Sequence, residues 1–433
     1  MNGVIMTDIN FTKLRYDNET TLVKILEDDF AIKNYYDIFE NKDELKQIVN
    51  QLLSDSVKLN HIIAPRLYQI CEKAKQIINY TEEIDFFIIS SIEVNAFSIN
   101  GFSYVPHMIC LTSALVKLLT DEELLFVIGH EIGHLIFKHS QLYVVNSLMS
   151  NREEHEIPAH ISNIFTRWNQ YAEISADRVG FVVQPNLEII GNVFFKFASG
   201  LSEQHLNFNI KEYLKQLDTI KELKVGDFYS SHPGHLIRLK SLDLFSNSTL
   251  YPLNQARHDL INPKKLNLEL DELISLIEFH PKDEDEIKAV EFISAVGSYI
   301  SYSDGDMNSQ EWEMLYEYLI RFTSKPEQYL DFKDMKEIEK RSKAICKYYG
   351  KQVDNEDKYI LFQLMMKLVI ADGRLEEEEK TKLFEIGKEL KISEKRIKEI
   401  IREESENYLS PRKKLTQSKL FSKKTNQDQY EKK

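Results

Sequence analysis

The stretch FVIGHEIGHLIFKH, residues 126–139, constrains this 433-residue chain more than any other part of it. It places two histidines and a glutamate among apolar residues, and such side chains are costly to bury without partners. His130 and His134 are four residues apart, which on an α-helix is about 40° of rotation, so both imidazoles leave one face. Glu131 follows the first histidine and can reach whatever the pair holds. The H-E-x-x-H pattern predicts a zinc site in which the glutamate accepts a proton from water.

His139 is the nearest further histidine, and it is not a good third ligand. It lies nine residues beyond His130, so on an uninterrupted helix it is expected about 180° away, pointing away from the site. The related pattern H-E-x-x-H-x-x-G-x-x-H requires a glycine and a histidine where this chain has Phe137 and Ser140. Ligation of the metzincin kind is therefore excluded.

Acidic residues further along the chain are the remaining candidates for the third ligand. Glu173 lies in YAEISADRVG, a helical pattern whose small side chains allow another helix to approach closely. Asp177 follows one turn later on the same face, where it is placed to accept a hydrogen bond from a ligating histidine. The small residues are Ala172, Ser175, Ala176 and Gly180. The competing carboxylates, Glu153, Glu154 and Glu156, lie beside Pro158 in a stretch that predicts a loop without helical register.

The bulk composition favours a cytoplasmic protein that does not bind nucleic acid. The chain has 55 Lys and Arg against 69 Asp and Glu, a net charge of −14 that would repel phosphate. Its first twenty residues lack a basic region followed by an apolar one, so no signal peptide is expected. No stretch approaches the about 18–20 apolar residues of a membrane span. Three scattered cysteines fit neither a zinc finger nor a disulfide framework, which favours a reducing compartment.

The hydrophobic patterns predict a mainly helical domain over residues 45–255, after an N-terminal extension, residues 1–44. The chain is expected to be irregular up to residue 40 and helical from residue 41. Residues 83–97 are rich in Phe, Ile and Val and predict one or two short strands. Thr112 or Ser113 is the expected N-cap of the helix that follows the strands. Thr120 and Glu123 form a capping box that opens the helix of the H-E-x-x-H motif.

The C-terminal part contains an internal repeat within a helical domain predicted over residues 283–408. Each copy has an apolar helix, an Asp-Gly turn, an acidic restart and a second helix, and the two turn aspartates are 68 residues apart. Polarity and prolines over residues 251–282 suggest the domain boundary. The tail, residues 411–433, carries eight basic and two acidic residues. It is expected to be disordered, with peripheral contact to an anionic membrane as the alternative.

The first Asp-Gly turn partly matches an EF-hand calcium loop. Asp304, Asp306 and Asn308 occupy positions 1, 3 and 5 of such a loop. Position 6 is Ser309 in place of glycine, and position 12 is Leu315 in place of glutamate. A turn or cap role for these aspartates is therefore favoured over calcium binding.

Four motifs, in order, resemble the zinc metallopeptidase family that includes HtpX and the type I CAAX prenyl protease. They are NAFSINGF (95–102), HEIGH (130–134), EISAD (173–177) and SHPGHLIR (231–238). The resemblance extends over about residues 45–250. It implies a gluzincin-type domain, α+β but mostly α, with a small β-sheet.

The resemblance also implies roles for individual residues. The implied zinc ligands, for one ion per chain, are His130, His134 and Glu173, with Glu131 as general base and Asp177 supporting a ligand. His232 and Arg238 match the family's His-Pro motif, which makes them candidate catalytic residues; His232 would stabilise the oxyanion or cap the metal in a latent state. Asn95, Ala96, Phe97 and Ser98 would form a strand beside the cleft on which an extended peptide pairs.

The chain departs from HtpX and the prenyl protease in one respect, because those are integral membrane enzymes and no span is predicted here. It resembles instead the soluble members, so prenylated substrates are not expected. The C-terminal repeat resembles TerB-like tellurite-resistance domains, which are all helical. The resulting hypothesis is a zinc-dependent metalloendopeptidase acting on protein or peptide substrates, latent until stress or a regulatory protein acts through the TerB-like domain. The alternative is a catalytically silent zinc-fold protein with a chaperone-like, binding or stress-sensing scaffold role.

Overall fold

The computed structural model divides the chain into two compact units. The first unit extends to Glu278, apart from residues 158–160, and the second begins at Phe279. The structure describes residues 9–28, 50–101, 105–150, 159–205, 207–223, 232–254, 257, 259–302, 309–330, 334–372 and 374–406. Helices dominate and one four-stranded sheet is present, which confirms the expected mostly α class.

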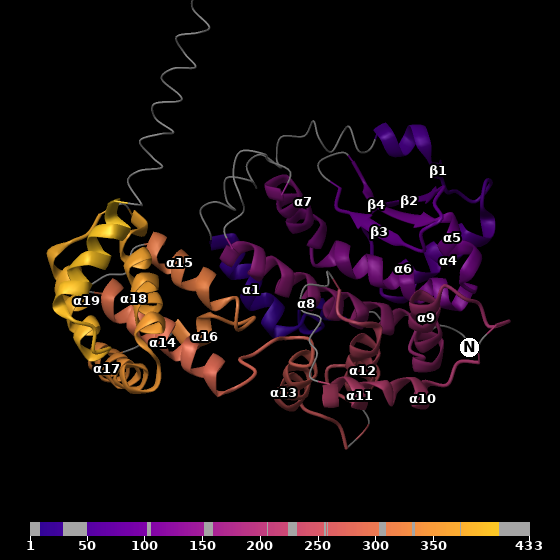
Figure 1. The fold of residues 1–433 in the computed structure, drawn as a ribbon. Helices are drawn as coiled ribbons and strands as arrows, with labels where there is room; N and C mark the ends of the chain where they lie inside the picture. The colour runs from indigo at the N-terminus through magenta and orange to yellow at the C-terminus, as the bar shows by residue number, and fades with distance from the viewer. Residues whose placement is uncertain are drawn as a thin grey trace, which may run out of the picture. The chain divides into compact units, whose positions relative to one another are not determined.

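The sheet lies in the first unit, and its strand order is β1-β2-β4-β3 (Figure 1). The strands are β1 (Val57–Lys58), β2 (Ile84–Ile89), β3 (Ala96–Ile99) and β4 (His107–Thr112). β2 and β4 are parallel, whereas β1 and β3 are antiparallel to their neighbours. One or two short strands were predicted over residues 83–97; this range contains β2 and the start of β3, while β4 was not predicted. Among the described residues, β3 is an edge strand that pairs with β4 alone.

Helix α6 (Asp121–Ile136) carries the H-E-x-x-H motif and contacts β3 and β4. The predicted capping box is present, because the Thr120 hydroxyl accepts from the Glu123 N–H and the Glu123 carboxylate accepts from the Thr120 N–H. The preceding helix, α5 (Ser113–Leu118), is capped by Thr112, one of the two expected residues. The start of the motif helix is therefore fixed by local sequence.

Helix α8 (Ala159–Val183) crosses α6 at very short range, because small residues lie at the crossing. A Cβ atom at Gly133 would lie 2.9 Å from the Cα atom of Ala176. A Cβ atom at Gly180 would lie 3.0 Å from the carbonyl oxygen of Phe126. Side chains larger than hydrogen would force these backbones apart. The small residues in the stretch 171–180 thus allow the close approach of a second helix, as predicted from the sequence.

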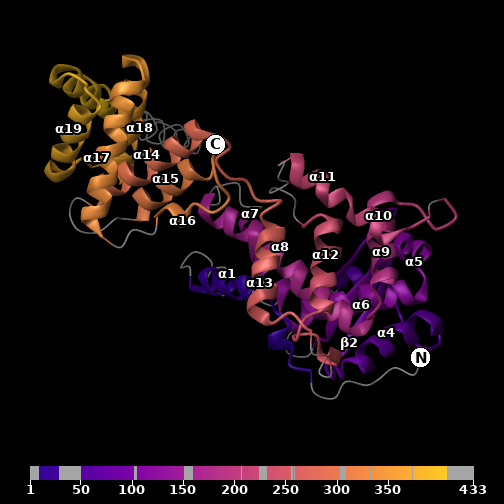
Figure 2. The same cartoon turned by 90° about the horizontal axis from the view of Figure 1, so that it is seen from below.

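Other helices complete the first unit; α9, α12 and α13 lie below α6 and α8 in Figure 1, and Figure 2 shows the same helices from below. Their bounds are α1 (Asp17–Asp28), α4 (Pro65–Ile77), α7 (His139–Ser150), α9 (Leu187–Ser199), α10 (Ile210–Leu214), α11 (Gln216–Leu223), α12 (His235–Ser246) and α13 (Pro263–Ile274). The expectation that residues 1–40 are irregular was wrong for residues 17–28, which form α1; residues 1–8 and 29–40 lie outside the described residues. Tyr16, Leu22 and Leu26 are buried in the main core, so α1 is an integral part of the unit.

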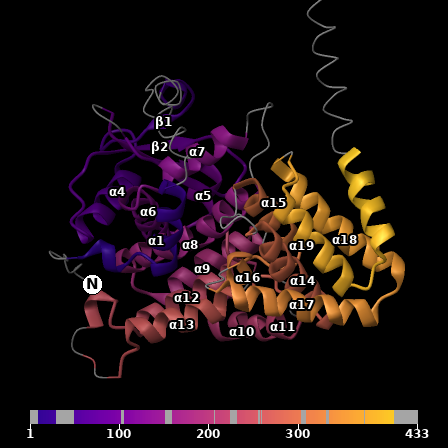
Figure 3. The same ribbon diagram turned by 90° about the vertical axis from the view of Figure 1, so that its left-hand side faces the viewer.

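All regular elements among the described residues of the second unit are helices, and Figure 3 shows them packed side by side. They are α14 (Glu284–Ser301), α15 (Ser309–Leu319), α16 (Glu327–Leu330), α17 (Met335–Gln352), α18 (Asn355–Val369) and α19 (Glu377–Glu389), followed by a helical stretch over 394–406. The two repeat copies correspond to α14–α15 and α18–α19. Asp304, Asp306 and Asn308 lie outside the described residues, as does the tail. Leu315, which occupies position 12 of the EF-hand pattern, is fully buried in the hydrophobic core of this unit.

Within the described residues, no helix has the length and apolar content needed to cross a bilayer.

The helix crossing yields a first prediction. Gly133→Ala would place a methyl group against the backbone of α8 and should destabilise the protein by about 1–3 kcal/mol, as overpacking does. Chemical denaturation measures the change. Gly234→Ala is the control, because its added Cβ meets no atom within 4 Å. Equal stability of both variants would contradict the close approach of the helices.

Candidate metal centre

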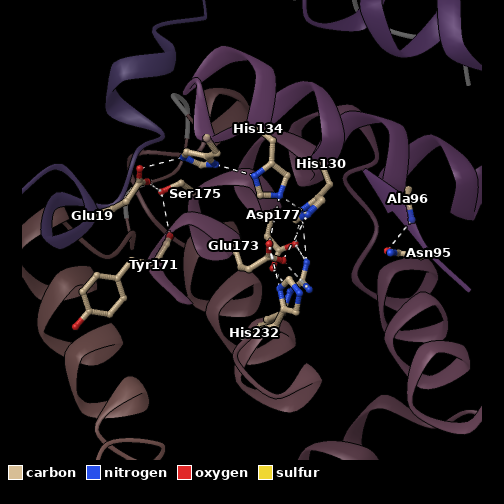
Figure 4. Close-up of polar contacts among 12 residues, drawn as sticks. Glu19, Asn95, Ala96, His130, His134, Tyr171, Glu173, Ser175, Asp177 and His232 are labelled. Carbon is tan, nitrogen blue, oxygen red and sulfur yellow. Dashed lines mark hydrogen bonds and ion pairs between the residues drawn. The ribbon is translucent and has the colours of Figure 1, made fainter. Parts of the chain in front are cut away.

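Helices α6 and α8 bring His130, His134 and Glu173 together. One ligand atom from each of the three lies within 4.8 Å of the others. The two Nε2 atoms are 3.0 Å apart. The Glu173 carboxylate places Oε1 3.3 Å from Nε2 of His134 and Oε2 3.5 Å from Nε2 of His130. Figure 4 shows the two imidazoles and the carboxylate converging on one point.

This donor set fits zinc in both chemistry and spacing. Two imidazole nitrogens and one carboxylate are the protein ligands of a common class of catalytic zinc site, which leaves one position for water. Zinc–ligand bonds of about 2.0–2.1 Å in a tetrahedron separate neighbouring ligand atoms by about 3.3 Å. The observed separations of 3.0, 3.3 and 3.5 Å lie around that value. Both Nδ1 atoms have other partners, so the Nε2 atoms are the ones left to bind a metal.

Asp177 contacts His130 from the side opposite the ligand atoms. Its Oδ1 lies 2.9 Å from Nδ1 of His130. A carboxylate only accepts, so Nδ1 carries the hydrogen and Nε2 presents its lone pair to the site. Sequence reasoning placed Asp177 in this position.

Arg238, from α12, joins the two carboxylates of α8. Its Nη1 lies 2.9 Å from Glu173 Oε2, and its Nη2 and Nε lie 2.6 and 2.8 Å from the two oxygens of Asp177. Burial by itself would raise the pKa of Glu173, but the nearby positive charges, Arg238 foremost, hold it well below its usual range. Burial likewise opposes the charged form of Arg238, yet Asp177 and Glu173 raise its pKa. Arg238 therefore keeps both carboxylates ionised and oriented.

A cavity of about 420 Å³ opens onto the three ligands. Glu131, which is 5% exposed, lines it beside them. The segment 94–98, which includes edge strand β3, forms one wall, and this segment contains the expected substrate residues Asn95, Ala96, Phe97 and Ser98. The candidate base, the three candidate metal ligands and the edge strand of the described sheet therefore border one cavity.

His232 stands at the same cavity but outside the group of three ligands. Its side chain is 54% exposed, and its Nδ1 lies 3.3 Å from Glu173 Oε1. In Figure 4 its ring approaches the carboxylate of Glu173 from the side opposite the two histidines. The alternative ligands Glu153, Glu154 and Glu156 lie outside the described residues.

His139 does not point away from the site, as the assumption of one continuous helix predicted. Helix α6 ends at Ile136, and Lys138 adopts a left-handed conformation with φ of 59°. The chain then restarts as α7, so the His139 ring turns back: its Nδ1 lies 2.7 Å from Nδ1 of His134. No glycine or proline marks this break in the sequence, which is why sequence reasoning missed it.

Glu19, in α1, is the second residue that sequence reasoning missed. Its Oε1 lies 3.0 Å from Nε2 of His139, and its side chain is fully buried. Burial would raise the pKa of this carboxyl, but His139 and Arg15 outweigh burial and lower the pKa to about 2. Burial lowers the pKa of His139 to about 4, which favours its neutral ring.

Comparison with known families agrees with this geometry. Residues 63–245 match the family described as Peptidase family M48, and residues 290–402 match Tellurite resistance protein TerB. The first region belongs to peptidase family M48. The H-E-x-x-H helix, Glu173 and Arg238 all lie inside the M48 region, whereas Glu19 lies outside it.

The M48 region also resembles individual proteins. It is 25% identical over 202 residues to the plastoglobule-localized metallopeptidase 48, chloroplastic, of Arabidopsis thaliana, covering 43% of this chain and 58% of the relative. It is 31% identical over 122 residues to a protease HtpX homolog of Helicobacter acinonychis, covering 28% of this chain and 37% of the relative. The chain thus spans between about one third and three fifths of these relatives. No solved structure matches it.

Arg238 gives a second prediction for the M48 region. Arg238→Ala would leave Glu173 and Asp177 buried without their cation, and breaking such a pair costs about 3–5 kcal/mol. Denaturation of the metal-free protein should show that loss. The control is Arg66→Ala, because Arg66 and its partner Asp121 form an exposed pair that should contribute about 0–1 kcal/mol. Similar losses in the two variants would refute the role given to Arg238.

Proposed function

We propose that the M48 region is a zinc-dependent metalloendopeptidase that hydrolyses peptide bonds in protein substrates. The observation that carries this proposal is the position of Glu131 in the cavity that also holds His130, His134 and Glu173. A binding protein would need the ligands but not an adjacent carboxylate. The names of the relatives, a metallopeptidase and a protease, support the same reading.

The chemistry follows from the side chains around the cavity. A bound zinc ion would lower the pKa of water and polarise the peptide carbonyl. Glu131 would accept the proton of the attacking water and pass it to the leaving amine. His232, at the cavity and next to Glu173, would donate a hydrogen bond to the carbonyl oxygen as it becomes negative. Arg238 would act indirectly, by holding Glu173 in place.

Substrate would bind along the free edge of β3. Residues 96–99 pair with β4 on one side, and no described strand pairs with the other edge, which would accept an extended peptide by strand addition. Phe97 is 38% exposed, as expected on a surface that a partner covers. The adjoining cavity is lined by the apolar side chains of Val94, Phe126, Val127 and Phe197. This lining favours a substrate with a large apolar residue near the cleaved bond.

The main rival is a catalytically silent zinc-fold protein. Such a protein has no need of the proposed base, yet Glu131 is present together with all three ligands. Four further predictions are separate from the proposed peptidase activity. They are latency, regulation through the TerB-matching region, a cytoplasmic location and a membrane contact of the tail. The fold of the two units supports none of them directly.

Substitution of the base tests the activity. Glu131→Gln removes the proton acceptor but preserves the shape of the side chain, so zinc binding should persist while peptide cleavage falls by about 10²–10⁴-fold or more. Zinc content and cleavage of a denatured protein substrate are measured side by side. Glu122→Gln is the matched control, because Glu122 is an exposed glutamate in the first turn of the same helix. Full activity of the Glu131 variant would refute the mechanism.

Truncation tests latency. If the TerB-matching region restrains the peptidase, a chain ending at Glu278, where the first unit ends, should cleave the same substrate faster than the full chain. Equal rates, with the truncated protein folded by circular dichroism, would argue against restraint by that region.

A further inference from the structure

We propose that helix α1 belongs to the metal centre, with Glu19 acting through His139 to position the ligand His134. This inference rests on the proposed zinc site. It assigns a role to a segment that lies before residue 63, where the match to the peptidase family begins.

The hydrogen positions in this chain of contacts follow from the ligand at one end and the carboxylate at the other. If Nε2 of His134 binds a metal, its hydrogen is on Nδ1, which donates to Nδ1 of His139 across 2.7 Å. Nδ1 of His139 then accepts, so the ring hydrogen of His139 is on Nε2. This Nε2 donates to Oε1 of Glu19 across 3.0 Å. These hydrogen positions require an acceptor next to Nε2 of His139, and the Glu19 carboxylate is that acceptor.

Glu19 is itself fixed from several directions. Arg15, four residues earlier and just before the start of α1, pairs with Oε1 at 2.6 Å. The hydroxyl of Ser175 donates to Oε2 and accepts the backbone N–H of Tyr16 at 2.9 Å. Ser175 is two residues beyond the ligand Glu173 on α8. One carboxylate therefore links α1 to the helix of the third ligand and, through His139, to the second ligand.

The two histidine ligands are thus supported in parallel ways. His130 donates directly to a carboxylate, Asp177, whereas His134 donates to a neutral imidazole that donates to Glu19. Partners of this kind fix the ring orientation and raise the basicity of a metal-binding histidine. Glu19 and His139 are positioning residues, because neither lines the cavity.

The alternative is that Glu19 and His139 only hold α1 in the core. Zinc affinity distinguishes the two roles, because a purely structural contact would not change the affinity of the folded protein. Glu19→Leu in the full chain removes the acceptor and should weaken zinc binding by about 10–100-fold, the usual effect of removing such a partner. A chromophoric chelator measures the affinity, and circular dichroism checks that each variant is folded. Glu27→Leu, at an exposed glutamate on the same helix, should leave the affinity unchanged.

Two substitutions of His139 provide an independent test. His139→Asn keeps an acceptor close to the former Nδ1 position, whereas His139→Leu fills similar space with no acceptor. The expected order of zinc affinity is wild type, then Asn, then Leu. A packing role predicts equal zinc affinity for the two folded variants and a difference only in stability, where leucine suits the fully buried position better.

The outcomes separate this inference from the proposed function. A wild-type chain that fails to bind zinc would overturn both. If the wild type binds zinc and Glu19→Leu binds it equally well, only this inference falls. The same conclusion follows if His139→Leu binds zinc as tightly as His139→Asn, or more tightly.

Discussion

The close contact of α6 with α8 is the constraint on which the site depends. A Cβ atom at Gly133 would lie 2.9 Å from the Cα atom of Ala176, which leaves no room for a side chain at the crossing. His134 is the next residue on α6, and Glu173 lies one turn before Ala176 on α8. The distance between the helices therefore sets the distance between the candidate ligands. Packing of small residues, rather than any property of the ligands, brings a carboxylate to within 3.3 Å of the imidazole.

That short distance concentrates charge in a buried region. Glu173, Asp177 and Glu19 are each buried, and an unpaired buried carboxylate would cost several kcal/mol. Arg238 pairs with the first two and Arg15 with the third. Apolar residues in their place would fold with less electrostatic cost. The retention of this network in the core is therefore easier to explain by a metal-binding role than by stability alone.

Sequence reasoning succeeded where a signal is local and failed where the chain changes direction or where distant segments meet. The capping box of Thr120 and Glu123 depends on only four consecutive residues, so the sequence alone predicts it. The position of Asp177 relative to Glu173 follows from one helical turn. Strand β4 was missed because its residues, buried from Met108 onward, form a continuous apolar run that lacks the alternation of a half-buried strand. Helix α1 was missed because its stability comes from tertiary contacts.

His139 shows how one backbone angle can decide the environment of a site. Helical periodicity places this residue opposite His130, but a single left-handed residue, Lys138, ends α6 and turns the ring back onto His134. A non-glycine residue in that conformation is unfavourable by itself. The conformation is held here by the contacts that His139 makes on both sides, with His134 and with Glu19. Since Glu19 comes from a segment before residue 63, the buried contacts around the candidate metal centre extend beyond the region that sequence similarity identifies.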